Sequence, residues 1–285
     1  MKADLHLHTN YSDGVESPAG VVARAAALGF GVVAVTDHDT VGGVQEAMEA
    51  GRRLGIRVVP GVEITSQSHQ QELHLLAYFP PRNHEGKGWR HPDLIRQLER
   101  DASRRMERAK QIVGRLNKLG VPLTMEEVCR HASGAPTPLA NTVGRPHIAS
   151  ALLAAGHVSS MEEAFIKYLK KGCLAWVDKE RAEAGEIIAL IHRAAGIVAL
   201  AHPGLMRPAA IPSHLCEEGI DGIEVYHSRH NHAQSRRFRG WTREKGLLVV
   251  GGSDCHGMLK GEPLMGGVQL AGEDLHRFLE RLDAL

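Results

Sequence analysis

Residues 3–14 read ADLHLHTNYSDG, and the alternation of polar and apolar residues at the start of this stretch predicts a β-strand. Residues two apart on a strand project from the same side, so His6 and His8 project together while Leu5 and Leu7 project to the other side. Two neighbouring imidazoles suit a metal ion. The alternative is that they are ordinary surface or core histidines.

The composition is that of a globular protein. Of the 285 residues, 43% are hydrophobic and 24% charged, and a formal net charge of +1 gives no global field for nucleic acid or a membrane. Four cysteines without CxxC spacing argue against a zinc ribbon or a disulfide framework and fit a reducing compartment. No apolar run has the length of a membrane span, and the first residues lead into a strand rather than a signal peptide. We therefore expect a cytoplasmic protein.

Strands and helices alternate at both ends of the chain, which predicts βαβ units. Strands are expected at 3–9, 31–40, 56–65, 72–79, 197–204, 220–228, 247–257 and 266–270. Helices are expected at 17–30, 41–55, 182–196 and 272–285. Between about His91 and Asp178 the pattern contains only helices, among them a long charged one at 93–120. We interpret this segment as a helical insertion. Acidic residues interleave with Arg104, Arg105 and Arg108, which favours a solvated face over a nucleic-acid surface.

Histidine, aspartate and glutamate residues gather where the expected strands end. These residues are His6, His8, Asp37, His38, Asp39, Glu63, His202, Asp254 and His256, while His74 lies on the fourth strand. In α/β barrels the carboxyl ends of the strands converge on the active site. Asp254 and His256 repeat the spacing of His6 and His8, and the alternation turns Cys255 away as a packing residue.

The chain resembles the PHP (polymerase and histidinol phosphatase) superfamily. The matching pieces, in the family's order, are DLHLHTNYSDG, VVAVTDHDT, VVPGVEIT, ELHLLAYF, ALAHPG and GGSDCHG. The resemblance implies a distorted (β/α)7 TIM-like barrel, in two parts at residues 1–90 and 181–285, with an all-helical insertion at 91–180. It also implies two or three divalent metal ions in the site.

The resemblance assigns the candidate ligands to three ions. The first would be held by His6, His8, Glu63 and Asp254, the second by Glu63 as a bridge with His74 and His202, and the third by Asp13, His38 and His256. The family often has a histidine where this chain has Asp13. Mixed imidazole and carboxylate ligands suit Mn²⁺, Fe²⁺ or Zn²⁺ better than Mg²⁺. The resemblance makes manganese the first choice.

Such metals supply hydroxide at neutral pH and neutralise a phosphate, which predicts hydrolysis of a phosphoester. Neither a GxSxG elbow nor a Walker motif occurs in the chain. Asp39 and His227 are candidates to protonate the leaving group; Asp39 is alternatively a partner of a ligand histidine. His227 also belongs to a basic cluster that either faces an anionic substrate or begins a solvated helix.

The expected insertion contains the segment GRPH at 144–147, which resembles the PHP subfamily acting on 3′,5′-nucleoside bisphosphates. In that interpretation Arg145 and His147 hold a substrate phosphate. The alternative is a plain helix start at Pro146. Lys179 is a further candidate for anion binding, or an ordinary surface lysine.

The expected function is removal of the 3′-phosphate from 3′,5′-nucleoside bisphosphates such as pAp by a metal-bridging hydroxide. The alternatives are a 5′-3′ exoribonuclease on short RNA, a histidinol phosphatase, and a non-catalytic PHP module that binds a partner. A small nucleotide is the expected partner, with short RNA second, and the sequence suggests neither a membrane nor an obligate protein partner.

Overall fold

The computed structural model describes residues 1–69, 71–81, 87–131, 143–206, 213–257 and 264–285. The chain forms two compact units. The first, which we call the barrel unit, comprises Met1–Arg96 and Arg181–Leu285, and the second, the helical unit, comprises Gln97–Glu180. In the part of the chain that is described, no helix is both long and apolar enough to cross a bilayer.

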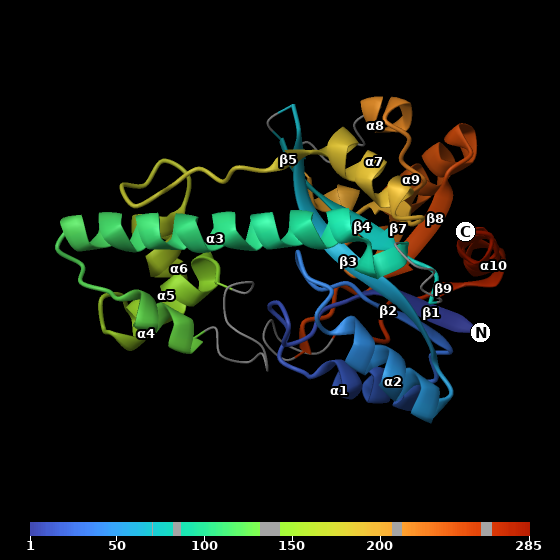
Figure 1. The fold of residues 1–285 in the computed structure, drawn as a ribbon, viewed down its shortest axis with the longest axis horizontal. Helices are drawn as coiled ribbons and strands as arrows, with labels where there is room; N and C mark the ends of the chain where they lie inside the picture. Colours follow the sequence, from blue (N-terminus) through green and yellow to red (C-terminus); the bar gives the residue numbers. More distant parts are fainter. Residues whose placement is uncertain (70, 82–86, 132–142, 207–212, 258–263) are drawn as a thin grey trace. The chain divides into compact units, whose positions relative to one another are not determined.

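The barrel unit is built on one mixed sheet (Figure 1). Its strands are β1 (Lys2–Leu7), β2 (Val32–Val35), β3 (Arg57–Ser68), β4 (Gln71–Tyr78), β5 (Ala182–Glu183), β6 (Ile197–Leu200), β7 (Gly222–His227), β8 (Leu248–Gly252) and β9 (Leu270–Ala271). The strand order is β8-β7-β6-β4-β3-β2-β1-β9, and β5 pairs with β3.

The sheet curls until its two ends almost meet, which makes a nearly closed barrel. Leu7 and Cys255 form a parallel bridge, with His8 N donating to Cys255 O over 3.1 Å. Asp254 N donates to His6 O over 2.9 Å, one step closer to β8. The end of β1 and the residues that follow β8 are therefore held together by backbone hydrogen bonds.

Two strands run against their neighbours, the short β9 beside β1 and, within the sheet, β4. β4 pairs antiparallel with both β3 and β6, whereas β1, β2 and β3 are parallel, as are β6, β7 and β8. Residues near the start of β4 therefore lie at the same end of the barrel as the carboxyl ends of its neighbours, and His74 pairs in register with Thr65 of β3. This reversal brings His74 to the site end of the barrel although it lies early in its strand.

Helices cover the strands of the barrel unit, with α1 and α2 together on one side (Figure 1). They are α1 (Pro18–Ala27), α2 (Val44–Leu54), α7 (Ala184–Arg193), α8 (His214–Glu217), α9 (His232–Lys245) and α10 (Gly272–Asp283). Ser17 caps α1 by accepting from Gly20 N, and Pro18 opens that helix, as expected. Leu5, Leu76 and Tyr78 belong to a core that the strands share with α9 and α10, and Cys255 is packed in a second core with α1 and α2.

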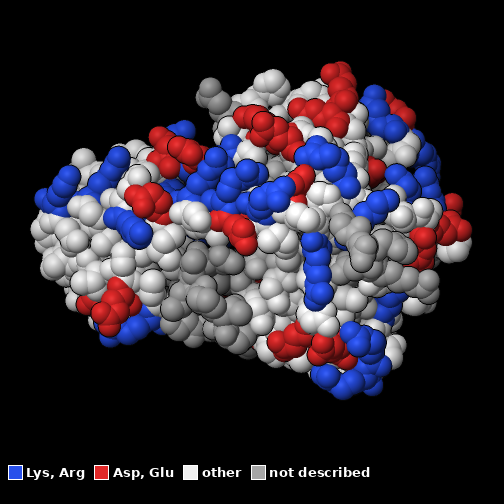
Figure 2. All heavy atoms as spheres, in the orientation of Figure 1, with Lys and Arg blue, Asp and Glu red and all other residues white. Residues whose placement is uncertain are grey.

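The helical unit has its own core, formed by α3 (Pro92–Lys118, which begins in the barrel unit), α4 (Met125–His131), α5 (Arg145–Ala154), α6 (Met161–Ala164) and a π-helical turn at Phe165–Leu169. Lysine and arginine side chains lie along α3 among acidic ones (Figure 2). Arg104 pairs with Asp101 over 3.6 Å and Lys110 with Glu107 over 3.9 Å. The exposed Arg104 agrees with a solvated charged face, whereas Arg108 packs against Trp176 and donates to Val177 O over 2.8 Å.

Some elements differ in length from the sequence expectation. β2 ends at Val35, because Thr36 to Asp39 leave the ladder and only His38 forms a further bridge, to Glu63. The last strand is two residues long rather than the five expected at 266–270. α9 begins in the basic segment after β7, where Asn231 and Gln234 form a capping box.

Barrel closure generates a prediction at Gly252. A methyl group there would lie 2.4 Å from His6 N and Cβ, so Gly252→Ala must push β8 away from β1. We expect the free energy of unfolding to fall by about 1–3 kcal/mol, measured by urea denaturation. Gly240→Ala on α9 is the control, because a methyl there meets nothing within 4 Å; it should leave stability unchanged or raise it by about 0.5–1 kcal/mol. Equal effects at both glycines would contradict the tight closure.

Candidate metal centre

Four potential ligand atoms converge at the end of β1. His6 Nε2 lies 3.1 Å from His8 Nε2, and both side chains are fully buried. Glu63 Oε2 is 3.3 and 3.2 Å from these two nitrogens, and Asp254 Oδ1 is 3.5 and 3.1 Å from them. Three atoms about 3.2 Å apart, such as His6 Nε2, His8 Nε2 and Glu63 Oε2, leave room for an ion about 2 Å from each of them, which is the length of a metal–ligand bond. These residues can hold one ion.

Glu63 presents its second oxygen to another pair of histidines. Oε1 is 2.8 Å from His74 Nδ1 and 2.9 Å from His202 Nε2. His74 comes from the reversed strand β4, and His202 follows β6 in a left-handed conformation with φ 29°. The Glu63 carboxylate is itself fully buried. Its two oxygens therefore face two different groups of imidazoles, which is the arrangement of a bridging ligand.

A third group is more open to solvent. Asp13 Oδ1 lies 3.0 Å from His256 Nε2, 3.8 Å from His8 Nδ1 and 3.9 Å from His38 Nε2. The side chain of Asp13 is 34% exposed and that of His38 22%. Residues His8, Asp13, His38 and His256 can together hold an ion. His38 Nδ1 is also 3.1 Å from Glu63 Oε2, so this third group adjoins the first.

Three histidines are held with one ring nitrogen free to bind a metal. His6 Nδ1 donates to Glu224 Oε1 over 2.9 Å, and His256 Nδ1 donates to the backbone carbonyl of Asp254 over 2.8 Å. Each ring therefore keeps the lone pair of Nε2 for the centre of the cluster. His8 follows the same rule, because Ser12 Oγ donates to Asp37 and so can only accept from His8 Nδ1, at 3.4 Å. Metal-ligating histidines are held in this way.

The charges of the cluster are strongly coupled. Burial opposes the charged form of His8, but hydrogen bonds to Asp254 and Glu63 outweigh it and raise the pKa of this imidazole to about 10. Burial likewise opposes the charge on His74, and Glu63 raises the pKa of that ring to about 9. For His38 burial dominates and lowers the pKa to about 3. Burial alone would raise the pKa of Glu63 and Asp254, but the surrounding imidazoles hold both below the usual range.

The polar atoms facing the cluster fit divalent metal ions. Glu63 Oε2, His38 Nδ1 and His256 Nε2 are buried and lack a well-aligned hydrogen bond among the described residues, and their polar neighbours at 3.0–3.3 Å are themselves candidate ligands. Buried polar atoms without hydrogen bonds are costly unless another partner satisfies them. Nitrogen and carboxylate donors at these separations match Mn²⁺, Fe²⁺ or Zn²⁺, and all nine ligands expected from the sequence lie in this one cluster.

Buried carboxylates that were not among the expected site residues support the cluster from behind. Asp37 accepts from Thr9 N, Thr9 Oγ1 and Ser12 Oγ at 2.6–2.7 Å. Asp4 accepts from Ser253 N over 2.9 Å, and burial raises the pKa of its carboxyl to about 6. Glu224 contacts both His6 and His202. A signal for Glu224 was available, since it is a lone carboxylate within the apolar stretch GIEVY.

The two candidate proton donors are buried and engaged. Asp39, with φ 52°, accepts from Thr65 N over 2.8 Å and from Thr65 Oγ1 over 3.2 Å. His227 Nδ1 accepts from Arg229 N over 3.1 Å, so a neutral ring carries its proton on Nε2, 3.3 Å from Asp254 Oδ2. The side chain of His227 has no exposed surface. These contacts favour bracing roles for Asp39 and His227 over direct proton transfer.

The candidate substrate residues Arg145, His147 and Lys179 all lie in the helical unit. The Arg145 guanidinium lies 4.9 Å from the ring centroid of Trp176, and its Nη1 donates to Leu169 O over 3.4 Å. His147 Nδ1 accepts from Gly144 N over 3.0 Å and so caps the start of α5. The segment 144–147 therefore begins a helix, whatever else its side chains bind.

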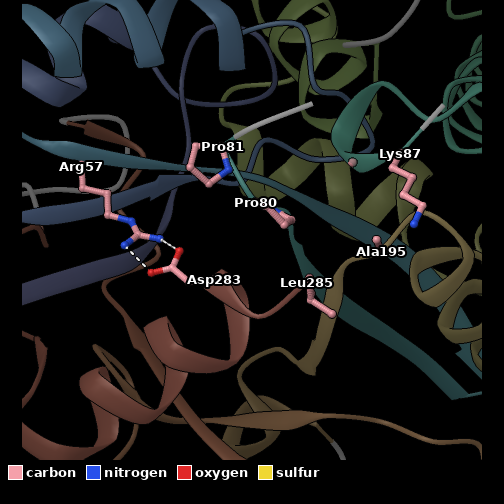
Figure 3. Close-up of a pocket in the computed structure, with 8 residues that line it drawn as sticks. Arg57, Pro80, Pro81, Lys87, Ala195, Asp283 and Leu285 are labelled. Atoms are coloured by element: carbon pink, nitrogen blue, oxygen red, sulfur yellow. Dashed lines mark hydrogen bonds and ion pairs between the residues drawn. The ribbon is translucent and has the colours of Figure 1, made fainter. Parts of the chain in front are cut away.

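A pocket of about 510 Å³ in the barrel unit contains none of the candidate ligands (Figure 3). It is lined by Arg57, Pro80, Pro81, Lys87, Gly88, Ala195, Asp283 and Leu285. Arg57 begins β3 and pairs with Asp283 at the end of α10. Glu63 lies six residues further along β3, so this pocket is at the opposite end of the barrel from the cluster.

Comparison with known proteins places these observations among phosphoesterases. The PHP domain model matches residues 4–200. The 5′-3′ exoribonuclease Rnm of Escherichia coli K12 is 32% identical over 89% of this chain and 84% of its own length. The 3′,5′-nucleoside bisphosphate phosphatase of Chromobacterium violaceum is 30% identical over 89% and 86%. A Bifidobacterium adolescentis structure assigned as a metal-dependent phosphoesterase matches with a TM-score of 0.83 at 31% identity, over 98% of this chain and 96% of that one.

The protonation of the cluster predicts that metal binding releases protons. Both pKa values are raised, to about 10 for His8 and about 9 for His74, so both rings are charged in the metal-free protein at neutral pH. A ligand imidazole must be neutral, so the apparent affinity for Mn²⁺ should rise about tenfold per pH unit for each displaced proton, up to about pH 9. Calorimetric titration in buffers of different ionisation enthalpy counts the protons. Binding without proton release at neutral pH would contradict these assignments.

Proposed function

The chain belongs to the PHP domain family, and we propose that it hydrolyses the 3′-phosphate of 3′,5′-nucleoside bisphosphates, giving a nucleoside 5′-monophosphate and phosphate. It is a metal-dependent hydrolase of phosphoric esters. The observation that carries the choice of substrate is the likeness to the C. violaceum bisphosphate phosphatase over 89% of the chain, together with the GRPH segment.

The nine candidate ligands would hold two or three divalent ions, for which manganese is our first choice. His6, His8, Glu63 and Asp254 would hold the first, Glu63, His74 and His202 the second, and Asp13, His38 and His256 the third. Bound there, such ions activate water and neutralise phosphate charge.

The side chains around the cluster determine where substrate can enter. His6, His8 and Glu63 are fully buried, whereas the side chains of Asp13, His38, His74 and His202 are between 16% and 34% exposed. A substrate phosphate would therefore reach the cluster from the side of Asp13, His38, His74 and His202, whose side chains are partly exposed. His227 holds Asp254 from the buried side and keeps its Oδ1 directed at His6 and His8. Both expected proton donors are engaged in contacts with neighbouring residues, which supports positioning roles for them in the proposed reaction.

A second candidate function is 5′-3′ exoribonuclease activity on short RNA. The E. coli relative with that activity is 32% identical over 260 residues, close to the value for the phosphatase. Both reactions break a phosphoester bond at the 3′ side of a nucleotide, so the same ligands would serve either. The two substrates differ in the cleaved phosphate, which is a terminal monoester in the bisphosphate and a diester joined to the next nucleotide in RNA.

A substrate comparison tests the proposal. Manganese-loaded protein is incubated with adenosine 3′,5′-bisphosphate, a 5′-phosphorylated short RNA and histidinol phosphate, and the specificity constants are compared. We expect the bisphosphate to give the highest value. His202→Ala should lower turnover by about two orders of magnitude or more, because it removes a ligand facing Glu63. A higher specificity constant for the RNA would favour the exoribonuclease, and hydrolysis of none of the three would contradict both functions.

Arg145 provides a second prediction about substrate choice. If its guanidinium holds the phosphate that is not cleaved, Arg145→Ala should lower the specificity constant for the bisphosphate by about 30- to 1000-fold and change hydrolysis of an aryl phosphate little. Arg115→Ala is the matched control, because Arg115 also bonds a backbone carbonyl of the same unit, that of Trp176. Equal losses on both substrates would place Arg145 at the cleaved phosphate, and no loss would leave it a structural residue of α5.

A further inference from the structure

Glu224 on β7 contacts two candidate ligands that belong to different groups. Its Oε1 accepts from His6 Nδ1 over 2.9 Å, and its Oε2 accepts from the backbone N–H of His202 over 2.7 Å. His6 faces the first group, around Glu63 Oε2, and His202 faces Glu63 Oε1. A single carboxylate therefore holds one member of each of the two groups that Glu63 bridges.

A β-bulge explains how β7 supplies this contact. The register between β7 and β8 shifts between Glu224 and Tyr226, so one extra residue is inserted on β7. In a regular strand Glu224 and His227 would project to opposite faces, because they are three residues apart. The bulge turns both toward the cluster, where Glu224 contacts His6 and His202 while His227 contacts Asp254. β7 thereby supports ligands on β1 and after β6 and β8 without contributing one of the nine itself.

Each contact of Glu224 fixes a different property. The hydrogen bond to Nδ1 settles which nitrogen of His6 carries the proton and leaves Nε2 for the centre of the cluster. The bond to His202 N holds a residue whose φ of 29° lies in the left-handed region that favours glycine. The Glu224 side chain is fully buried. A buried carboxylate is costly unless its partners compensate for the loss of water, so these two contacts are essential to its placement.

We propose that Glu224 is a positioning residue that fixes the proton of His6 and the turn at His202, and thereby sets the metal affinity of the two groups bridged by Glu63. The inference rests on the proposed metal centre. Loss of either contact of Glu224 should make His6 or His202 less well ordered, but it removes none of the nine ligand side chains. The number of ions bound at saturation should therefore stay the same, and their dissociation constants should rise.

Glu224→Gln tests this, because glutamine keeps the volume but retains only one acceptor oxygen, which can accept from His6 Nδ1 or from His202 N but not from both, while its NH₂ group can accept from neither. Binding of Mn²⁺ is measured from the paramagnetic resonance signal of the free ion. We expect a dissociation constant about 10- to 100-fold higher than that of the wild-type protein, with unchanged stoichiometry. Glu244→Gln on α9 is the control, because that side chain is 69% exposed and pairs only locally with Lys245 among its described contacts.

The outcomes separate this inference from the proposed metal centre. A wild-type protein that takes up no Mn²⁺ would overturn the metal centre itself. Wild-type binding together with unchanged affinity in Glu224→Gln would overturn the role of Glu224 alone. Should Glu224→Gln not fold, Glu224→Asp decides, because it keeps the charge but is too short to reach both partners. Weakened Mn²⁺ binding in that variant supports the role, and wild-type affinity rejects it.

Discussion

The buried carboxylate of Glu63 is the point on which the site end of the barrel depends. Its Oε1 faces His74 and His202, and its Oε2 faces His6, His8 and His38. These residues come from or follow four strands that are distant in sequence, and they can converge only if the sheet curls back on itself. A fully buried carboxylate among five imidazoles is tolerable only when charges compensate it. Metal ions or protons supply that compensation, which is why metal binding and protonation are linked here.

A layer of other carboxylates keeps the convergent residues in place. Asp4 links β1 to Ser253 after β8, Asp37 links the end of β2 to the loop after β1, and Asp39 links that same segment to Thr65 of β3. Glu224 links β7 to His6 and His202. Most of these acceptors bond backbone N–H groups where regular pairing has stopped, so they satisfy groups that would otherwise be buried without partners. The positions of the ligands therefore depend on hydrogen bonds at several strand ends together and not on any one strand.

The candidate metal ligands and the candidate substrate residues lie in different units of the chain. The barrel unit contains all nine candidate ligands, and phosphoester hydrolysis is the chemistry of its family. The candidate substrate residues lie in the helical unit, where Arg145 lies against Trp176 and His147 caps α5. Two relatives of similar identity to this chain are named for different activities, an exoribonuclease and a bisphosphate phosphatase, and a shared family does not by itself fix the substrate.

The sequence by itself determined the features that depend on local periodicity. Alternation placed His6 and His8 on one face of a strand and turned Cys255 into the core, and capping residues marked the start of α1. Motif order identified the family and with it the barrel. Only the tertiary structure decided what depends on contacts between distant segments. The reversed direction of β4 brought His74 to the cluster, and the bulge in β7 turned Glu224 and His227 to the same side, against the period of two. Contacts with Thr65 and with the Asp254 carboxylate showed that the side chains of Asp39 and His227 are engaged. A periodic pattern specifies which face a residue occupies, but strand direction, bulges and long-range hydrogen bonds are settled only when the sheet closes.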